Sequence, residues 1–375
     1  MNAVKLTIIL LVITMTYACS NESKPIKSDL LLTPEQVLGK QLFSETRLSE
    51  PAGQACISCH NPNAGFSRMQ DQASPSPVSA GAIKHRFGNR NTPTISYAAY
   101  IPKLNFDKKE EHYVGGLFLD GRENSLELQV KGPLFNPVEM AIPDKNLLFQ
   151  KLKTLGYESS FKKVYGQSGF ENANSVLEKL ASSIAAYERS FELSPFDSKY
   201  DAYLNGKATL TEQEQRGLKL FEAEDKGNCA ACHPSQPDSE NKRPLFTDFT
   251  YDNLGVPANS KNPFYKQSKE FNPDAENYID SGLGTIVKDA NQNGKFRVPT
   301  LRNIARTAPY MHNGVFENLK EVVDFYNTRD TKKWPKPEVS KNVNKDELGD
   351  LKLTEQEVDD LVAFMKTLTD GYKIK

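Results

Sequence analysis

Residues 56–60 read CISCH, and residues 229–233 read CAACH. Two cysteines one helical turn apart and an adjacent histidine form the motif that attaches c-type haem. The two thiols can add to the two vinyl groups of one haem, while the histidine ligates its iron. The sequence therefore predicts two covalently bound haems c. The predicted haem-binding residues are Cys56, Cys59, His60, Cys229, Cys232 and His233.

Two other uses of paired cysteines fit the sequence less well. A thioredoxin-like redox pair needs a βαβ context, and the segments beside both motifs lack the pattern of strands. A structural zinc site needs further closely spaced ligands. The chain has five cysteines, and the one outside the two motifs, Cys19, lies close to the N-terminus. No cysteine remains for a structural disulfide.

A sequence repeat precedes the two motifs: LTPEQVLGKQLF at 32–43 resembles LTEQEQRGLKLF at 210–221. Each copy has a threonine at a helix N-cap position, a glutamate in the first turn and apolar residues at helical spacing. Each half of the chain also closes with a helical pattern, at 175–191 and at 353–369. The repeat therefore indicates two copies of one helical unit in tandem.

Stretches rich in Asn, Gly and Pro follow the two motifs, at 61–94 and at 234–296. A small helical domain cannot enclose a macrocycle unaided, so we expect these stretches to be long loops around the haems. The predicted fold is all-α, with two tandem cytochrome c-like domains at 30–200 and 201–375, each with one covalently bound haem.

The first residues, MNAVKLTIILLVITMTYACS, have the pattern of an export signal. One lysine precedes an apolar run, which ends in small residues before Cys19. The run is too short for a membrane span. Residues 1–18 are predicted to be a signal peptide of the lipoprotein type, with Cys19 lipidated; plain export is the alternative. This pattern predicts a periplasmic or otherwise exported protein that touches a membrane only through a lipid anchor.

The charge balance argues against one class of partner. The chain has 47 Lys and Arg residues against 48 Asp and Glu residues, so its net charge gives no reason to expect binding to nucleic acid.

Three further segments resemble the bacterial di-haem cytochrome c peroxidase superfamily, which includes the MauG proteins. They are RNTPT (90–94), DGRENSLELQVKGPLFNPVEM (120–140) and FRVPTLRNIARTAPYMHNG (296–314), in this order around the two haem motifs. The resemblance covers nearly all of the chain after the leader. It implies that the N-terminal haem is the site of peroxide reduction and that the C-terminal haem transfers electrons.

The resemblance also implies three residues over the N-terminal iron, which match Gln129, Pro133 and Glu139. Cleavage of peroxide requires a proton to move from its inner to its outer oxygen, and Glu139 is a suitable general acid–base. Gln129 can orient peroxide by hydrogen bonding, and Pro133 can cap the pocket without donating. Without the resemblance, Glu139 would be interpreted as a surface carboxylate in a loop.

A calcium ion between the two haems is a further implication of the resemblance. Its protein ligands match the side chain of Asn91 and the backbone carbonyls of Thr307 and Pro309. Oxygen donors suit this hard cation, and waters would complete its coordination. From the sequence alone, Asn91 would pass as a turn residue.

Two positions depart from the pattern of the superfamily. The family usually carries FWDGR, whose tryptophan lies between the haems, whereas this chain reads FLDGR with Leu119 in that place. Its only tryptophan, Trp334, lies in a predicted loop. In many members a loop histidine blocks the peroxide-binding iron at rest. His85 lies two residues nearer to the RN motif than that histidine would, so a ligand and a solvated loop histidine are both left open.

The segment ENLKEVVDFYN (317–327) has apolar residues on one face of a short helix, and Tyr326 shares this face. Tyr326 lies 14 residues after His312, where peroxidases of this family carry a methionine that ligates the second haem and MauG proteins carry tyrosine. We therefore predict Tyr326 as the second ligand of that iron. A core tyrosine with another ligand, such as Met311, and an iron without a sixth ligand are the alternatives.

The leading hypothesis is a di-haem peroxidase. It would reduce hydrogen peroxide with electrons that pass through the C-terminal haem to the N-terminal haem, donated by a cytochrome c or a cupredoxin. One alternative is a MauG-like enzyme that uses peroxide to oxidise a protein or an organic substrate. The other is a non-catalytic electron carrier in which both irons have six ligands. The predicted cofactors are two haems c and Ca²⁺.

Overall fold

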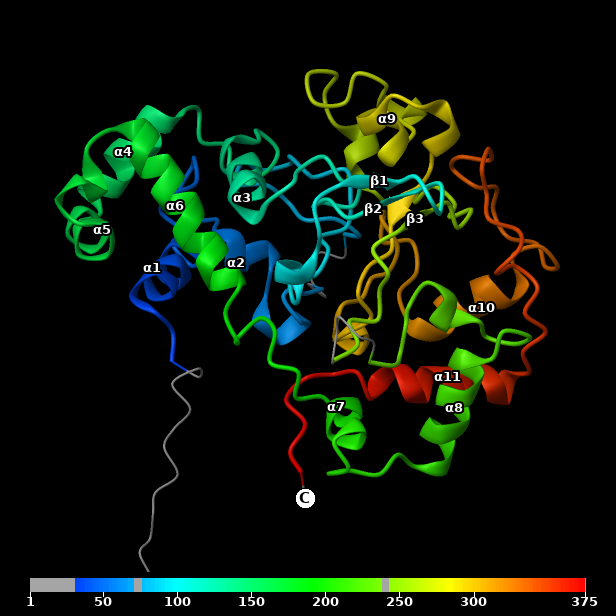
Figure 1. Ribbon diagram of the computed structural model, residues 1–375. Coiled ribbons are helices and arrows are strands. Elements are labelled where there is room, and N and C mark those ends of the chain that lie inside the picture. The colour runs from blue at the N-terminus through cyan, green and yellow to red at the C-terminus, as the bar shows by residue number, and fades with distance from the viewer. Residues whose placement is uncertain (1–30, 71–75, 238–242, 375) are drawn as a thin grey trace, which may run out of the picture. The chain divides into compact units, whose positions relative to one another are not determined.

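The computed structural model describes residues 31–70, 76–237 and 243–374 (Figure 1). Residues Leu32–Lys375 form one compact unit. The predicted signal peptide and Cys19 lie outside the described residues. Among the described residues, no helix is long and apolar enough to cross a bilayer.

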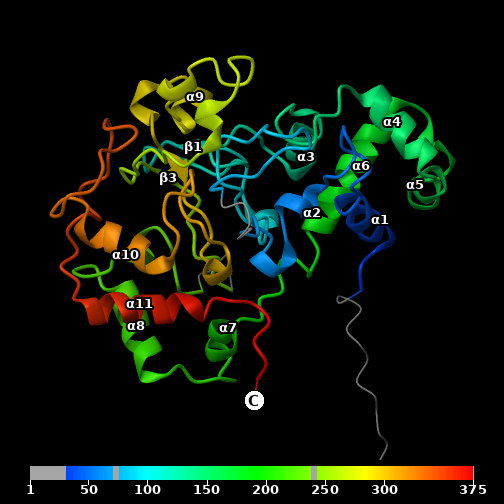
Figure 2. The ribbon, with the colours of Figure 1, turned by 180° about the vertical axis from the view of Figure 1, so that it is seen from behind.

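Helices joined by long loops make up the N-terminal half of this unit (Figure 2). Two short strands pair in an antiparallel hairpin, with Phe106 opposite Tyr113. The elements of this half are α1 (Pro34–Phe43), α2 (Cys56–Cys59), η2 (Pro62–Ala64), η3 (Ala98–Tyr100), β1 (Asn105–Asp107), β2 (His112–Val114), α3 (Leu126–Phe135), α4 (Lys145–Thr154), α5 (Glu158–Tyr165), η4 (Gln167–Phe170) and α6 (Ala173–Glu188).

The C-terminal half has the same character, and its two-residue strands also pair antiparallel, with Tyr251 opposite Arg297. Its elements are α7 (Lys199–Leu204), α8 (Glu212–Glu222), η5 (Cys229–Ala231), β3 (Tyr251–Asp252), η6 (Pro263–Lys266), η7 (Ala275–Asn277), α9 (Leu283–Val287), η8 (Ala290–Gln292), β4 (Phe296–Arg297), η9 (Ile304–Arg306), α10 (Leu319–Thr328) and α11 (Glu355–Lys366).

The helices predicted from the repeat are confirmed as α1 and α8, and both begin with a capping box. Thr33 and Gln36 exchange hydrogen bonds at the start of α1, and Thr211 and Glu214 do the same for α8. Each box satisfies backbone N–H groups that the first turn would otherwise leave unpaired. The helix starts could therefore be predicted because their signals are local.

A glycine in each repeat helix allows a close helix crossing. A Cβ atom on Gly39 of α1 would overlap the carbonyl oxygen of Ser183 in α6, and one on Gly217 of α8 would overlap that of Asp360 in α11. The helix pairs α1/α6 and α8/α11 lie side by side in both ribbon views (Figures 1 and 2). The two glycines are equivalent in the repeat, so each half uses the same close helix crossing within its own core.

The buried apolar side chains form two main clusters, one running from Leu38 to Leu193 and the other from Tyr200 to Leu368. Two cores are what two tandem cytochrome c-like domains require. The predicted fold class is therefore confirmed, with the two strand pairs as additions. The boundary between residues 200 and 201 stays a prediction, and α7 spans it.

Candidate functional site

The second haem motif borders a cavity that is lined mostly by residues of the C-terminal half. Cys229, Cys232 and His233 line this cavity together with apolar side chains from α8, α10 and α11. The Nδ1 atom of His233 donates to the carbonyl oxygen of Phe246 at 2.8 Å. Burial lowers the pKa of His233 to about 4. The ring is therefore neutral, and its Nε2 lone pair is free for a metal.

The first haem motif repeats this arrangement. The Nδ1 atom of His60 donates to the carbonyl oxygen of Phe66 at 3.1 Å, and burial lowers its pKa to about 4. Phe66 and Phe246 both adopt left-handed backbone conformations, with φ of 55° and 54°. Two histidines held in one tautomer beside paired cysteines are what two covalently bound haems need.

A second layer of hydrogen bonds fixes each of these carbonyl groups. The backbone N–H of Ile95 donates to Phe66, and that of Leu301 donates to Phe246, at 3.2 and 3.3 Å. One residue earlier, the hydroxyl of Thr94 donates to Gly65, and that of Thr300 donates to Leu245. We call this set the histidine frame; its members are Gly65, Phe66, Thr94 and Ile95 in the first half and Leu245, Phe246, Thr300 and Leu301 in the second.

The cysteines of both motifs are unlike those of a redox pair. Burial raises the pKa of Cys56, Cys229 and Cys232 to about 12. None of the four motif cysteines forms a disulfide within the described residues. A disulfide-exchange cysteine needs a lowered pKa so that its thiolate can attack. The protonated, buried thiols fit attachment to a bound haem and do not fit the redox alternative.

The three predicted distal residues lie in one segment. Gln129 and Pro133 are four residues apart in α3 and therefore share one face of this helix. Glu139 follows in the next turn, where the amide of Asn136 donates to its Oε1 at 2.8 Å. Burial raises the pKa of Glu139. Glu139 is linked to the first haem motif through the loop at Ala80–Ala82. The N–H of Ala82 donates to the carbonyl oxygen of Glu139, and the amide of Gln54, two residues before Cys56, donates to that of Ala80, both at 2.7 Å.

His85 lies on an exposed turn with a left-handed backbone, φ 65°. The same loop contacts the distal segment, because the N–H of Ala82 donates to the carbonyl oxygen of Glu139 at 2.7 Å. The structure thus brings the loop of His85 next to Glu139.

The three predicted calcium ligands line the same cavity as the second motif. The amide nitrogen of Asn91 donates to the carbonyl oxygen of Pro309 at 2.6 Å. A turn of this amide by 180° would present its oxygen beside that carbonyl oxygen, as a shared cation requires. Thr307 lies two residues before Pro309. These three residues therefore fit a hard cation, and the ion itself stays a prediction.

Tyr326, on α10, also lines the cavity of the second motif. Burial raises the pKa of its phenol, and the charges of Cys229 and Cys232 add to the shift. In the described part of the chain, its hydroxyl has no hydrogen-bond partner. Met311 lines the same cavity, so the structure keeps both candidate ligands near the second haem. Leu119 lines it too, at the place where the family carries tryptophan.

A set of buried ionisable side chains beside this cavity could not be predicted from the sequence. Arg90 pairs with Asp280 and with Asp120, in both cases at 2.6 Å. His312 pairs with Glu338 at 3.1 Å and stacks on the ring of Phe296 at 4.0 Å. The paired residues are 26 to 190 positions apart in the chain, so no local pattern could have identified these pairs.

Two C-x-x-C-H motifs with matching histidine frames define a di-haem c-type cytochrome. Residues 34–209 match the model of the di-haem cytochrome c peroxidase family, and residues 214–369 match that of cytochrome c. The methylamine utilization protein MauG of Paracoccus denitrificans is 36% identical over 89% of this chain and 88% of its own length. The chain belongs to the di-haem cytochrome c peroxidase family, and the prediction of two haems c is confirmed.

Two further relatives agree with this assignment. Cytochrome-c peroxidase IdrP1 of a Pseudomonas species is 33% identical, over 92% of this chain and 83% of its own length. The crystal structure of the diheme peroxidase BthA from Burkholderia thailandensis superposes with a TM-score of 0.78 at 34% identity. It covers 91% of this chain and 87% of its own.

Proposed function

We propose that this protein reduces hydrogen peroxide to water at its N-terminal haem, with electrons that arrive through its C-terminal haem. Relatives named cytochrome-c peroxidase support the reaction. The observation that carries the assignment to the N-terminal haem is the half-buried carboxyl of Glu139 beside the first motif.

His60 and His233 would hold the two irons through Nε2, and the haems, when bound, supply the iron that binds peroxide and the electrons that reduce it. Glu139 takes the proton from the inner peroxide oxygen and returns it to the outer one. Its raised pKa suits this role, because a group with a pKa closer to the working pH can both accept and donate a proton. Asn136 holds the carboxyl in place through its 2.8 Å hydrogen bond.

Gln129 and Pro133 complete the distal side in this proposal. The amide of Gln129 can donate to peroxide and orient it. Pro133 has no backbone N–H group, so it covers the pocket without competing for the peroxide oxygens. We further propose a calcium ion held by Asn91, Thr307 and Pro309, which would fasten the loop after the first motif to the loop of η9.

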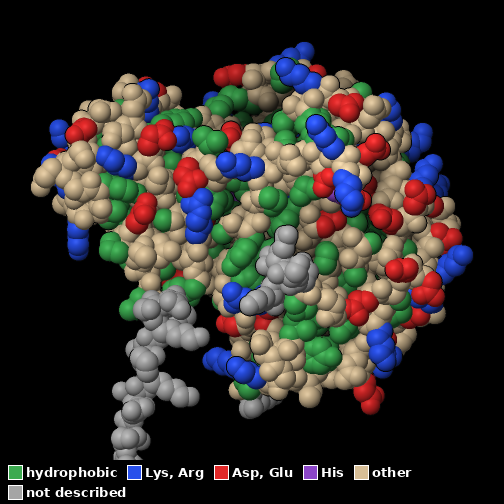
Figure 3. All heavy atoms as spheres, viewed as in Figure 1, with side chains coloured by type: hydrophobic (Ala, Val, Ile, Leu, Met, Phe, Trp, Pro, Cys, Tyr) green, Lys and Arg blue, Asp and Glu red, His purple; other side chains and the backbone are tan. Residues whose placement is uncertain are grey.

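The reductant is proposed to be a small redox protein, a cytochrome c or a cupredoxin. On the face shown in Figure 3, Lys and Arg side chains are interspersed with Asp and Glu side chains. Such a mixed surface gives no large field of one sign, so we do not expect a partner that binds through a strong net charge. We also propose export with a lipid anchor at Cys19, which would keep the enzyme and its donor in one compartment.

The test is steady-state consumption of peroxide by the di-haem protein with a panel of reduced donor proteins. The same protein is titrated with cyanide while its haem absorption is recorded. We expect turnover with at least one donor and rapid binding of cyanide by one haem. Two haems that bind no cyanide, together with no turnover, would instead establish an electron carrier.

A MauG-like oxidase of a protein or organic substrate is a second candidate, because Tyr326 lines the second haem cavity. A tyrosine oxygen ligand favours ferric iron and lowers the haem potential. This candidate predicts that peroxide oxidises both haems in the absence of a donor, and that a protein substrate is covalently altered. Mass spectrometry of candidate substrate proteins after peroxide addition separates the two functions.

A further inference from the structure

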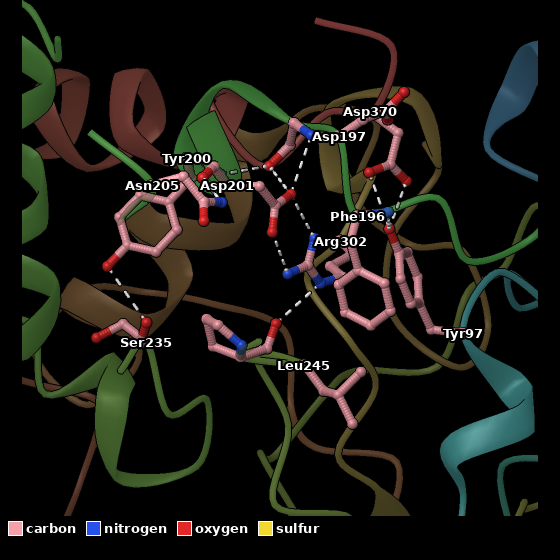
Figure 4. A network of polar contacts seen from close by, with 12 residues as sticks. Tyr97, Phe196, Asp197, Tyr200, Asp201, Asn205, Ser235, Leu245, Arg302 and Asp370 are labelled. Carbon is pink, nitrogen blue, oxygen red and sulfur yellow. Dashed lines mark hydrogen bonds and ion pairs between the residues drawn. The ribbon is translucent and has the colours of Figure 1, made fainter. Parts of the chain in front are cut away.

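A third, small cluster of buried side chains lies apart from the two main cores. Tyr97, Phe196 and Leu245 form it. The Tyr97 side chain is 2% exposed, and its hydroxyl donates to the two carboxylate oxygens of Asp370, at 2.8 and 2.9 Å (Figure 4). The backbone N–H of Phe196 donates to the same phenol oxygen at 3.0 Å. The buried phenol of Tyr97 is thus hydrogen-bonded directly to a buried carboxylate.

Tyr97 lies close to the histidine frames of both haem motifs. It lies two residues after Ile95. The backbone N–H of Ile95 donates to the carbonyl oxygen of Phe66, which also accepts the hydrogen bond from His60. Asn303 holds the equivalent position in the second frame, and the two residues share a left-handed backbone with φ 62°. The amide of Asn303 donates to Asp370 at 2.7 Å. The carboxylate of Asp370 therefore accepts hydrogen bonds from one residue beside each frame, Tyr97 and Asn303.

Aromatic rings connect Tyr97 to the protein surface. Tyr100 is 41% exposed, and its ring centroid lies 6.4 Å from that of Tyr97. Phe196 contacts both rings, with centroids 4.7 Å from Tyr97 and 5.5 Å from Tyr100. The aliphatic side chain of Leu119 cannot be oxidised reversibly, whereas a phenol can. This path therefore contains oxidisable side chains, whereas Leu119 is not one.

The electrostatic surroundings of Tyr97 couple loss of an electron to loss of a proton. The guanidinium carbon of Arg302 lies 4.9 Å from the centre of the Tyr97 ring. Arg302 is itself paired with Asp201 at 2.9 Å, so the group that acts directly on the phenol oxygen is the carboxylate of Asp370. A phenol becomes a strong acid when it loses an electron, so oxidised Tyr97 releases its proton, and Asp370, which already accepts its hydrogen bond, can take it. Burial raises the pKa of Asp370, which makes this carboxylate a better proton acceptor.

We propose that Tyr97 is a redox-active relay residue between the protein surface and the haems. After peroxide has oxidised the haems, Tyr97 gives them one electron and transfers its phenolic proton to Asp370. The neutral tyrosyl radical then takes one electron from the reductant through Tyr100, and the proton returns from Asp370. Two such cycles supply the two electrons that one peroxide consumes. The proposal rests on the proposed peroxidase function and adds a route for its electrons.

The experiment mixes the di-haem protein with hydrogen peroxide in the absence of a donor, freezes it within milliseconds and records its EPR spectrum. The haem absorption is followed in the same mixture. We expect a tyrosyl radical signal that narrows when the tyrosines carry ring deuterium. The signal should be lost in Tyr97→Phe and reduced at least tenfold in Asp370→Asn.

Tyr200→Phe is the matched control. Tyr200 is as deeply buried as Tyr97 and also lies near Arg302 (Figure 4), but its hydroxyl donates to the carbonyl oxygen of Ser235, which cannot accept a proton. This variant should keep the signal. Asp370→Asn retains the Tyr97 ring and a hydrogen-bond acceptor, so it tests the relay if Tyr97→Phe does not fold.

A signal that persists in both Tyr97→Phe and Asp370→Asn would overturn the relay. A haem absorption that responds to peroxide without any tyrosyl signal in the wild type would overturn it too and leave the peroxidase function standing. A haem absorption that does not respond to peroxide would contradict the peroxidase function, and the relay with it.

Discussion

The two halves of this protein hold their haem-ligating histidines in the same way and differ in what surrounds them. His60 and His233 donate to the carbonyl groups of left-handed phenylalanines. In each half a backbone N–H donates to that same carbonyl group, and a threonine hydroxyl donates to the carbonyl group one residue earlier. Beyond this frame, the first half presents Glu139 to its motif, and the second presents Tyr326. The frame is common to both halves, so the different roles that we propose for the two haems rest on residues outside it.

We expect the largest effect from cysteine substitutions that remove one haem at a time and so distinguish the two halves. Cys229→Ala with Cys232→Ala should lower the content of covalent haem from two per chain to one, and so should Cys56→Ala with Cys59→Ala. Covalent haem is measured after acid–organic extraction. The first pair should leave a haem that still binds peroxide, and the second should abolish peroxide binding.

A wild-type protein with one covalent haem per chain would contradict the tandem arrangement. Peroxide binding that survives loss of Cys56 and Cys59 would show that the peroxide site lies in the second half.

Glu139→Gln tests the residue that distinguishes the first half. We expect the rate of peroxide turnover to fall about 100-fold or more, because the amide cannot carry the proton between the two oxygens. The fold should be unchanged, since the glutamine can still accept the hydrogen bond from Asn136. Steady-state turnover and circular dichroism measure the two effects.

Glu178→Gln is the control for this variant, because Glu178 is an exposed carboxylate that pairs with Lys131 of α3. It should turn over peroxide at the wild-type rate. Equal rates for Glu139→Gln and Glu178→Gln would remove Glu139 from the mechanism.

Tyr326→Met tests the residue that distinguishes the second half. A thioether ligand stabilises ferrous haem relative to a tyrosine oxygen, so the reduction potential of one haem should rise. Spectral features of thioether ligation should appear, which the wild type lacks. Tyr203→Phe, at a partly exposed tyrosine of the same half, should leave both potentials unchanged. Thioether features in the wild type would instead assign the ligand position to a methionine, and Met311 is the nearest candidate.

We expect the smallest effect from alanine substitutions at the two helix crossings, which test whether the crossings of the two halves are equivalent. Gly39→Ala and Gly217→Ala should each lower the free energy of unfolding by about 1–3 kcal/mol, because the added methyl group overlaps the backbone of the crossing helix. Thermal or denaturant unfolding measures the loss. Gln41→Ala, on the exposed face of α1, should change it little. A loss in only one half would show that the two crossings are not equivalent.

The elements that could be predicted from the sequence have local signals. These elements are the haem motifs, the capping boxes of α1 and α8, and the apolar face of α10. Each of them is formed by residues that are only a few positions apart in the chain. The histidine frame could not be predicted, since it depends on backbone carbonyls of left-handed residues. The ion pairs of Arg90 and the bond from Tyr97 to Asp370 join segments up to 273 residues apart, so only the folded structure brings them together.

The position of Asp370 in the chain has a consequence for biogenesis. A chain that emerges with its N-terminus first exposes both haem motifs before Asp370 has been made or exported. The contact that joins Tyr97 to Asn303 is therefore available only after both motifs have been accessible to the machinery that attaches haem. This contact between the two halves therefore forms late, after the sequences of both motifs are complete.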